Sequence, residues 1–509
     1  MTGARPDNWQ AAAAALSQGR PALVWRKLVA DTETPVGAAL KLFEPGRGDF
    51  LLESVQGGEV RGRYSLLGLD PDLVFRAAGH GAEINRSWRH DRTDFVPLAG
   101  DALAELRALV GACRIDVPDE LPKALACLVG YFGYETIGLV ENLARAPASD
   151  LDLPDMLFVR PTLILVFDRL SDALWCVAPV WPDGDNATLL DSAAERIDEA
   201  LRRLAGPAPG ASTMADLPDP MLVPVLPEGR YREMVLKAKD YITAGDIFQV
   251  VLAQRFTAPF SLPPLALYRS LRRINPSPFL YFLDLPGFAL IGSSPEILVR
   301  VRDGTNGSKE VTIRPIAGTR PRGATPDEDR ANEAALLADP KERAEHLMLL
   351  DLGRNDVGRV AVQGTVRVTE SYTVERYSHV MHIVSNVVGQ LDTEKHDAVD
   401  ALFAGFPAGT VSGAPKVRAC EIIAELEHET RGAYAGGVGY FAPDGSVDSC
   451  IVLRTGIIKD GMLHVQAGAG IVADSDPEYE QRECEAKAGA LAAAAREAVR
   501  IAGEPGFGQ

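Results

Sequence analysis

The sequence has no surplus of positive charge and no long apolar run. Its 70 acidic residues outnumber its 52 lysines and arginines, so the formal net charge is −18. Such a charge argues against nucleic acid or an anionic membrane as a partner. No run of 18 apolar residues suggests a membrane span, and the N-terminus lacks a signal-peptide core. We therefore expect a cytoplasmic protein with no membrane and no nucleic-acid partner.

Paired cysteine motifs, repeats and a P-loop are also missing. The six cysteines show no CxxC spacing, and we expect them to be reduced and mostly buried. No repeat of 20–50 residues is present, and no segment has the GxxxxGK[ST] order of a nucleotide-binding loop. A length of 509 residues with 46% hydrophobic content predicts two or three domains, or one large intertwined one.

One break in composition divides the chain. Residues 206–229 are rich in proline and glycine and predict a linker. An amphipathic helix is expected over Thr188–Leu204, after strands over Leu163–Phe167 and Ala173–Val180. Beyond the linker, strands are expected over Ile247–Phe256, Ala289–Ile291, Ile297–Val301, Val311–Ile313, Ile451–Ile458 and Met462–Ala467. This mixture predicts an α+β fold, a layered sandwich with large antiparallel sheets flanked by helices.

Two acidic helix starts resemble each other. Asp339–Val360 and Asp476–Lys487 both open with Asp-Pro, a favourable helix entry. Each then carries two glutamates three residues apart, a spacing that places both on one helix face. The pairs are Glu342 with Glu345 and Glu480 with Glu483. Four carboxylates brought together favour a hard cation, for which Mg²⁺ is the natural candidate.

Simpler interpretations of these residues remain open. Glu342 lies three residues after Asp339 and is suitably placed to close a capping box. Glutamates at helical spacing commonly form a solvated surface. The apolar residues after His346 favour a partly buried cluster instead, because they carry this helix into a core.

Glycine-rich segments and basic residues accumulate in the C-terminal half. Thr410–Ala419 runs from a small-residue loop into a helix, whose backbone N–H groups suit a carboxylate. Gly468–Gly470 follows a predicted strand, and its glycines allow a ligand to approach the backbone or simply form a tight turn. The basic residues around these segments are Arg314, Arg320, Arg322, Lys416, Arg418, Arg454 and Lys487. Together these features describe a Mg²⁺-dependent enzyme that acts on a small polyanion.

Long strings across the chain then resemble a known family. They include GDIFQVVLAQRF (Gly245–Phe256), IGSSPEIL (Ile291–Leu298), RPIAGTRPRG (Arg314–Gly323), AEHLMLLDLGRND (Ala344–Asp356), SHVMHIVS (Ser378–Ser385), GTVSGAPKVRA (Gly409–Ala419), GGVGYF (Gly436–Phe441) and VQAGAGIVADSDPE (Val465–Glu478). The chain resembles the chorismate-utilising enzymes, and among them the large subunits (component I) of anthranilate synthase. The resemblance implies two interleaved subdomains. It also implies conversion of chorismate and ammonia to anthranilate and pyruvate, the first committed step of tryptophan biosynthesis.

The resemblance assigns roles to individual residues. Glu345 and Glu483 are expected to ligate Mg²⁺, with Glu342 and Glu480 beside them. Glu296 is the expected general acid for the departing hydroxyl, which requires a raised pKa. His382, otherwise a candidate core histidine, is associated with pyruvate elimination. The expected catalytic set is Glu296, His382, Gln249, Thr410 and Lys487, and the substrate cradle is Gly318, Thr319, Thr410, Tyr434, Arg454, Gly468, Ala469, Gly470 and Lys487.

Two positions separate the branches of this family. Relatives that add water to chorismate carry a lysine where this chain has Gln249, and glutamine cannot deprotonate water. Relatives that make aminodeoxychorismate carry a nucleophilic lysine where this chain has Ala317, which forms no covalent adduct. Both positions favour anthranilate synthase. Aminodeoxychorismate synthase, a stalled enzyme that releases aminodeoxyisochorismate, and a tryptophan-binding protein without catalysis remain the alternatives.

The N-terminal part resembles the family's tryptophan feedback site. The matching strings are LLES (Leu51–Ser54) and NPSPF (Asn275–Phe279), so L-tryptophan is expected to inhibit through Glu53, Ser54, Asn275, Pro276, Ser277 and Phe279. The expected division is an extension (1–23), a regulatory domain (24–205), the linker (206–229), a catalytic domain (230–491) and a helix end with a tail (492–509). No amidotransferase sequence is recognised, so a separate glutamine amidotransferase (component II) is expected to supply ammonia, and the protein is expected to be an oligomer.

Overall fold

The computed structural model describes residues 6, 8–56, 60–182, 185–209, 217–304, 307–377 and 380–504, except for the side chains of residues 55, 56, 60 and 61. Predictions that fall on residues 1–5 and 7 of the extension, on residues 210–216 of the linker, on Ser378 or on the tail beyond residue 504 lie outside this description.

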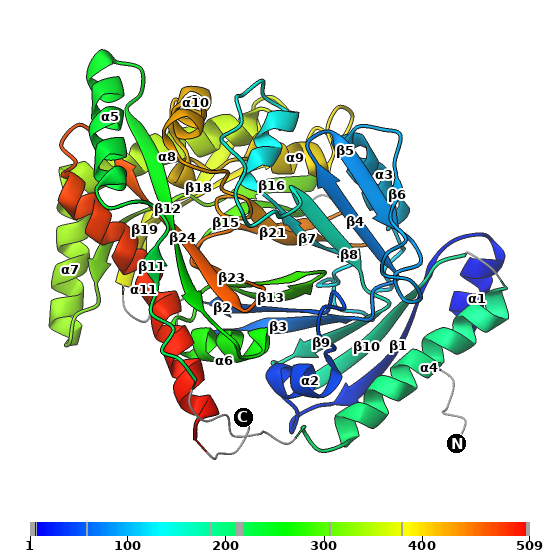
Figure 1. Cartoon of the computed structure of the whole chain (residues 1–509). Coiled ribbons are helices and arrows are strands. Elements are labelled where there is room, and N and C mark those ends of the chain that lie inside the picture. Colours follow the sequence, from blue (N-terminus) through cyan, green and yellow to red (C-terminus); the bar gives the residue numbers. More distant parts are fainter. Residues whose placement is uncertain are drawn as a thin grey trace.

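Two large antiparallel sheets face one another (Figure 1). The first sheet contains, in spatial order, β1 (Ala22–Val29), β10 (Ala173–Val180), β9 (Leu163–Asp168), β3 (Val60–Leu69), β2 (Phe50–Gln56), β13 (Phe279–Leu285), β14 (Phe288–Ser294), β23 (Thr455–Lys459), β24 (Met462–Ile471), β12 (Gln249–Pro259) and β11 (Val223–Pro224), with β20 (Gly413–Ala414) paired to β12. The second contains β17 (Ile316–Pro321), β19 (Val380–Gln390), β16 (Lys309–Ile313), β15 (Ile297–Asp303), β22 (Val447–Ile451), β21 (Gly437–Phe441), β7 (Leu128–Phe132), β8 (Met156–Arg160), β4 (Leu73–Ala78), β5 (Gly81–Asn85) and β6 (Val96–Pro97), with β18 (Arg367–Arg376) paired to β19.

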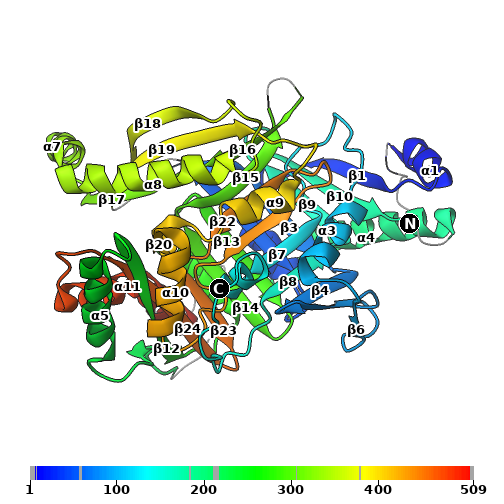
Figure 2. The same ribbon diagram turned by 90° about the horizontal axis from the view of Figure 1, so that it is seen from above.

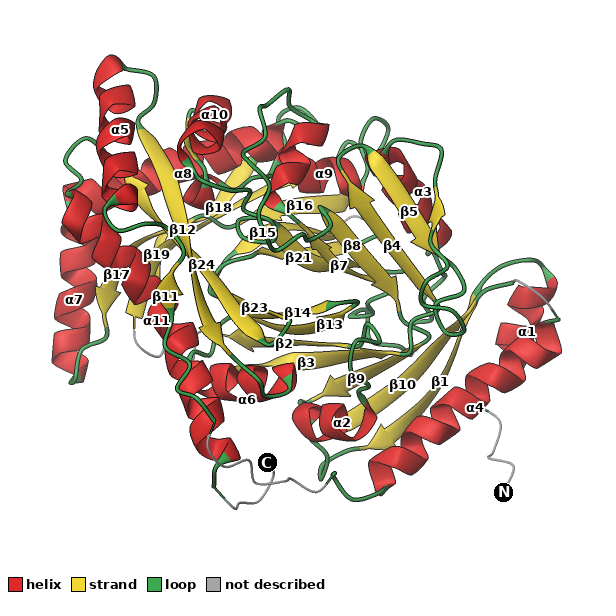
Figure 3. Ribbon diagram, in the orientation of Figure 1, coloured by secondary structure: helices red, strands yellow, loops and turns green. Residues whose placement is uncertain are grey.

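Helices cover the outer faces of the sheets (Figures 2 and 3). They are α1 (Trp9–Ser17), α2 (Pro35–Leu42), α3 (Ala102–Ala112), α4 (Asn186–Ala205), α5 (Arg230–Ala244), α6 (Pro264–Ile274), α7 (Pro326–Ala338), α8 (Pro340–Gly358), α9 (Ala398–Ala404), α10 (Lys416–Leu426) and α11 (Pro477–Ala502), with short 3₁₀ turns at Tyr134–Leu139 and Gly409–Val411. Helix α4 packs on β1 and β10, α6 and α11 pack on the other half of the first sheet, and α8 packs on β17 and β19. No helix in the described ranges is long and apolar enough to cross a membrane.

Both sheets draw strands from both sides of residues 206–229. The first sheet joins β1, β2, β3, β9 and β10 to strands that follow α5, and the second joins β4–β8 to β15 and its neighbours. The predicted α+β sandwich with interleaved parts is therefore confirmed. The division into a regulatory and a catalytic segment stays a prediction.

Most predicted elements are confirmed, and two are corrected. Helix α4 contains the predicted 188–204 helix, and all six cysteines are free and buried. The single strand expected over Ile451–Ile458 is wrong, because the chain leaves β22 in the second sheet and enters β23 in the first. Gly468–Gly470 is not a turn after a strand, since these residues continue β24 and pair with Val251–Ala253 of β12.

Candidate active site

Two neighbouring crossings between the sheets bring predicted site residues together. The chain passes from β14 to β15 through Glu296, and from β22 to β23 through Arg454. The crossings are hydrogen-bonded to each other: Ile451 N donates to Glu296 O at 3.1 Å, and Ser293 N donates to Arg454 O at 3.2 Å. Arg454 adopts a left-handed backbone with φ of 47°, a strained conformation for a non-glycine residue. These two bonds thus join the backbones of the segments that carry Glu296 and Arg454.

Glu296 is a buried carboxyl with a strongly raised pKa. Its side chain is 6% exposed, and burial raises its pKa to about 8, against opposing contributions from Thr410 and the Ile316 backbone. Removal from water disfavours the charged form, so the carboxyl keeps its proton at neutral pH. The Thr410 hydroxyl is itself buried, and its contact with Glu296 falls short of hydrogen-bond geometry, which leaves it without a full partner among the described residues. The expected raised pKa is present, and the general-acid role stays a prediction.

His382 lies on β19, opposite Thr319 of β17. Its Nδ1 lies 3.0 Å from Gly318 O and 3.1 Å from Thr319 Oγ1. A carbonyl oxygen only accepts, so Nδ1 carries the proton and Nε2 is left as an acceptor. Burial, with a smaller contribution from nearby Arg454, lowers the pKa of His382 to about 4 against the opposing effect of the Gly318 hydrogen bond. His382 is therefore neutral at pH 7 and has a free basic nitrogen.

The two acidic helix starts face each other. Asp339 caps α8 by accepting from the backbone of Lys341 and Glu342, and Asp476 caps α11 by accepting from Tyr479 N. Glu342 closes no capping box; its carboxylate instead accepts from Arg320 Nη1 at 2.8 Å.

Charged side chains on each of these two helices shift the pKa of a glutamate on the other. Burial and then Glu342 raise the pKa of Glu345, while Lys487 of α11 acts against the shift. Burial and then Glu483 raise the pKa of Glu480, while Lys341 of α8 opposes it. A lysine of each helix thus acts on a glutamate of the other helix, whereas the expected gathering of all four carboxylates around one point is not confirmed among the described residues. No three His, Cys, Asp or Glu side chains of the described residues lie close enough to hold a metal ion by themselves.

The glycines of β24 form the floor between these helices and β12. Lys487 Nζ donates to Gly468 O at 2.8 Å and pairs with Glu483 Oε1 at 2.7 Å. A Cβ atom at Gly470 would lie 2.4 Å from Gln249 Nε2, and one at Gly468 would lie 2.9 Å from the Tyr434 hydroxyl. Only glycine allows both side chains to approach the strand this closely. Ala469 lies between the two, fully buried.

Gln249 connects the glycine segment of β24 to the acidic start of α8. Its Nε2 donates to Glu345 Oε1 at 3.4 Å. Its Oε1 is buried without a partner in the described part of the chain. Together with the Thr410 hydroxyl, the site therefore holds two buried polar atoms with unused hydrogen-bonding capacity. Unsatisfied buried groups are costly, and a bound ligand relieves that cost.

Most of the basic residues expected around the site are already paired with carboxylates of the protein. Arg314 pairs with Glu375, Arg320 with Glu342, Arg322 with Asp329, Lys416 with Asp356 and Arg418 with Asp246. Arg454 has no ion pair among the described residues, and burial lowers its pKa. The expectation of a general basic cluster is thus corrected. Arg454 is the guanidinium left for an anionic substrate.

Arg431 supports the site and was missed in the sequence. It is 1% exposed, and its guanidinium donates to Glu427, to Val411 O at 2.6 Å and to Val251 O at 2.7 Å. It also lies 5.5 Å from the ring centroid of Tyr434. One side chain thus joins the Thr410 turn, the strand that carries Gln249, and Tyr434. The Glu427–Arg431 spacing by itself predicts only a local ion pair, because the backbone partners at Val411 and Val251 are distant in the sequence.

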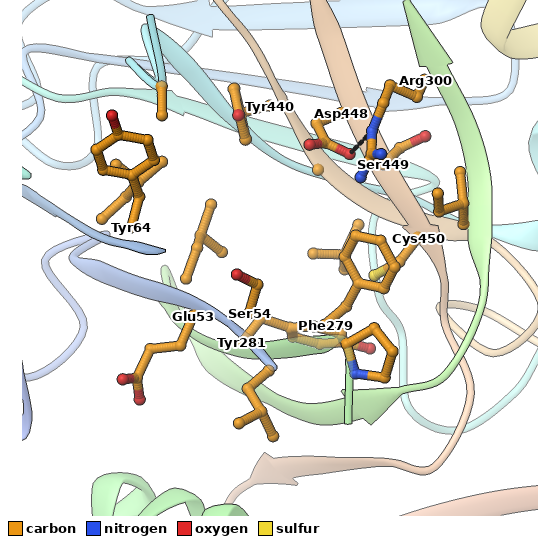
Figure 4. Close-up of a pocket in the computed structure, with 18 of the residues that line it drawn as sticks. Glu53, Ser54, Tyr64, Phe279, Tyr281, Arg300, Tyr440, Asp448, Ser449 and Cys450 are labelled. Carbon is orange, nitrogen blue, oxygen red and sulfur yellow. Dashed lines mark hydrogen bonds and ion pairs between the residues drawn. The ribbon is translucent and has the colours of Figure 1, made fainter. Parts of the chain in front are cut away.

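A cavity of about 620 Å³ lies between the two sheets (Figure 4). Ser54, Phe279 and Tyr281 contribute to it from the first sheet, and Tyr440 and Cys450 from the second. Arg300 pairs with Asp448 at 3.2 Å on its wall. The cavity thus has aromatic walls and a few polar groups, as ligand pockets commonly do.

The residues predicted to bind tryptophan divide into two groups at this cavity. Glu53, Ser54 and Phe279 line it, whereas Asn275, Pro276 and Ser277 are not among its lining residues. The carboxylate of Glu53 points out of the cavity in Figure 4, toward α6. There it accepts from Tyr268 at 2.7 Å and from Arg272 at 2.5 Å. Ser54 and Phe279 are therefore the predicted residues best placed to contact a ligand.

Fold and site together define a class of enzyme. A neutral buried carboxyl, a neutral histidine, an unpaired arginine and facing carboxylates suit acid–base chemistry on a small anion. The comparisons identify that class further. Residues 64–493 match the family model described as chorismate binding enzyme.

The similar proteins agree with this match. The anthranilate synthase component 1 of Cereibacter sphaeroides is 54% identical over 96% of this chain and 97% of its own length. That of Pseudomonas putida is 47% identical over 89% and 91%. The crystal structure of anthranilate synthase component I from Streptococcus pneumoniae covers 92% of this chain and 99% of its own, with 35% identity and a TM-score of 0.75. This chain belongs to the family of chorismate-binding enzymes, and the resemblance expected from its sequence is confirmed.

Proposed function

We propose that this protein is the large subunit of an anthranilate synthase, which converts chorismate and ammonia to anthranilate and pyruvate in tryptophan biosynthesis. The similarity that carries the proposal is the 54% identity to an anthranilate synthase component 1 over nearly the full length of both chains. The reaction has two stages. Ammonia adds at C2 while the C4 hydroxyl leaves as water, and then pyruvate departs and the ring becomes aromatic.

The residues at two positions favour this branch of the family. Gln249 is too weak a base to activate water, but its unpaired Oε1 suits an N–H of ammonia, which brings its own lone pair. Ala317 is 8% exposed on β17 and offers no nucleophile. Aminodeoxychorismate synthase is the second candidate, and no described residue favours it over anthranilate synthase.

The proposed acid–base roles follow from the protonation states. Glu296, protonated below about pH 8, gives its proton to the departing C4 hydroxyl. Arg454, which has no carboxylate partner among the described residues, holds a substrate carboxylate. Neutral His382 assists the loss of pyruvate, with its ring held through Nδ1 by Gly318 and Thr319. The Thr410 hydroxyl and Lys487 are proposed to bind the substrate as well.

The facing glutamates fit a magnesium ion. Like charge contributes to the raised pKa of Glu345 and of Glu480, a repulsion that a cation removes. Mg²⁺ needs only one or two protein carboxylates, because it keeps waters and takes substrate oxygens. We assign Glu345 and Glu483 as its ligands, with Glu342 and Glu480 beside them. When bound, the ion supplies positive charge against the substrate's carboxylate.

Ammonia is proposed to come from glutamine through a separate amidotransferase subunit. The similar proteins are named component 1, which supports a second component. Alone, the chain is expected to use free ammonium. Assembly into a larger oligomer remains a prediction.

Feedback inhibition by L-tryptophan is proposed at the cavity between the sheets. The 620 Å³ volume and the aromatic side chains Tyr64, Phe279 and Tyr440 suit an indole ring. Ser54 supplies a hydroxyl for the amino-acid end. Because both sheets line the cavity, an occupant bridges the same two layers that carry Glu296 and Arg454.

The test is turnover of chorismate by the purified chain with Mg²⁺ and ammonium at mildly alkaline pH, with products separated by chromatography. A fluorescent anthranilate peak that requires Mg²⁺ supports the proposal, and its loss on addition of tryptophan supports the inhibitor site. A non-fluorescent amino product would favour aminodeoxychorismate synthase or the stalled enzyme. No consumption, even with glutamine and an amidotransferase, would leave a binding protein as the better conclusion.

A further inference from the structure

A second cavity, of about 600 Å³, lies on the outer face of the first sheet. Leu69 of β3 and Leu163 of β9 line it together with Leu42 of α2 and Ala200 of α4. Side chains alternate along β3: Tyr64 and Leu66 face the cavity between the sheets, and Leu69 faces outward. Figure 3 shows α2 and α4 on the side of this sheet that faces away from the other one. The outer cavity is therefore separate from both sites described above.

The outer cavity carries a local excess of positive charge. Five arginines line it, namely Arg47, Arg89, Arg196, Arg202 and Arg203, and the carboxylates that line it are Asp70, Glu195 and Glu199. The chain as a whole has a net charge of −18. A basic cavity on so acidic a protein concentrates an attraction for anions at one place.

Four of these arginines are already bound. Arg47 pairs with Asp49 at 2.8 Å, Arg89 pairs with Asp70 at 2.8 Å, and Arg202 pairs with Glu199. Arg203 donates to Lys41 O at 2.8 Å and lies 3.4 Å from Glu44.

Arg196 differs from them. It has no hydrogen bond or ion pair within the described part of the chain, and its Nε is buried without a partner. Asp70 and Asp72 are near enough to attract it. Asp70 is already held by Arg89, however, and Asp72 accepts from both Nε and Nη2 of Arg160 at 2.8 Å. Burial and the like charge of Arg89 lower the pKa of Arg196. A half-buried guanidinium in this state lacks a counter-ion.

We propose that the outer cavity binds a small organic oxyanion, with its carboxylate or phosphate group on Arg196 and its apolar body on Leu69 and Leu163. The Arg196 Nε is closed off in the protein, but the two Nη groups have no partner among the described residues. The Nη1–Nη2 edge of a guanidinium offers two parallel N–H donors, which match two oxygens of such a group. The leucines supply the apolar surface that ligand pockets usually provide. The site is independent of the proposed reaction, since it shares no residue with the catalytic crossings or the tryptophan cavity.

The test compares thermal unfolding of the full chain with that of Arg196→Met and Arg500→Met, using phenyl phosphate, benzoate and inorganic phosphate as probes. We expect phenyl phosphate or benzoate to raise the melting temperature of the parent chain by about 2 °C at saturation. Arg196→Met should lose this response. Arg500→Met, which removes the same charge from an exposed position of α11 outside this cavity, should keep it.

The three probes distinguish the possible sources of the anion. A response to phenyl phosphate but not benzoate identifies a phosphate ester, and the reverse identifies a carboxylate. Either response should exceed that to inorganic phosphate, since the leucines contribute only to ligands with an apolar body. Without any anion, Arg196→Met should melt no lower than the parent chain, because it removes an unpaired buried charge.

Retention of the full anion response in Arg196→Met would overturn the proposal. If that variant fails to fold, Arg196→Lys decides, because lysine keeps the charge but loses the paired donors. Calorimetry should then give an affinity about tenfold weaker than that of the parent chain. An unchanged affinity in Arg196→Lys would contradict the assignment.

Discussion

At the scale of single residues, Glu296 is a carboxyl whose surroundings keep its proton in place. Glu296→Gln removes that proton and keeps the shape, so kcat should fall by about 10²- to 10⁴-fold while KM for chorismate changes little. The measurement is steady-state anthranilate formation. Glu485→Gln, on an exposed position of α11, is the matched control and should retain activity.

The pH profile gives Glu296 a second readout. Its acid form is present below the pKa of about 8 and is lost above it. Turnover at a fixed concentration of free ammonia should therefore decline as pH rises through 8. A rate that stays level well above this value would show that another group donates the proton.

Glu345 and Glu483 give the test of the metal assignment. Replacing either by glutamine removes a charge that the proposed Mg²⁺ site needs, so turnover should be abolished with the fold intact. Circular dichroism and melting temperature check the fold, and anthranilate formation at increasing Mg²⁺ checks the site. Retained Mg²⁺-dependent activity in both variants would rule out these ligands.

Gln249 is proposed to decide which nucleophile adds to chorismate. Gln249→Lys introduces a base beside Glu345 and should divert part of the reaction from ammonia to water, which appears as isochorismate on chromatography. Gln249→Asn, which adds no base, is the control. Anthranilate as the sole product at the parental rate would refute the role.

At the scale of elements, Arg431 joins α10, β12 and the turn at Thr410. Arg431→Met leaves Glu427 buried without its counter-charge, and the expected loss of unfolding free energy is about 3–5 kcal/mol. Urea unfolding measures it. The double variant Arg431→Met with Glu427→Gln should recover part of the loss, because no charge is then left unpaired.

A surface pair provides the comparison for Arg431. Arg500 and Glu497 of α11 are bonded in the same charge combination, but the Arg500 side chain is exposed to solvent and Glu497 is only partly buried. Arg500→Met should change stability little, since water screens and replaces that contact. Equal losses of unfolding free energy in Arg431→Met and Arg500→Met would mean that Arg431 stabilises the packing of these elements no more than a surface residue does.

At the scale of the whole molecule, the cavity between the sheets links the two halves of the chain. Ser54→Phe fills part of it without touching the catalytic crossings, so inhibition by tryptophan should weaken at least tenfold while uninhibited turnover is retained. The measurement is anthranilate formation against tryptophan concentration. Ser17→Phe, on the exposed side of α1, is the control. Unchanged inhibition in Ser54→Phe would place the inhibitor elsewhere.

The sequence alone determined the local features of this protein. The Asp-Pro starts, the glutamate spacing on α8 and α11, the α4 helix and most strands follow from residues near each other in the chain, where capping and periodicity act. The motif strings also identified the family. The four glutamates and Glu296 all lie in motifs that the sequence displays, and their roles stay predictions.

Only the tertiary structure decided how these pieces meet. The crossing at Arg454, which divides the expected strand Ile451–Ile458, depends on pairing with strands more than a hundred residues away. Distant partners likewise decide whether each basic residue is paired. They leave Arg196 without a counter-ion among the described residues, and they give Arg431 its place between three elements. Burial sets the pKa of Glu296, and burial is a property of the packed sheets. Local sequence fixes propensities, whereas charge states and cavities arise when remote segments exclude water together.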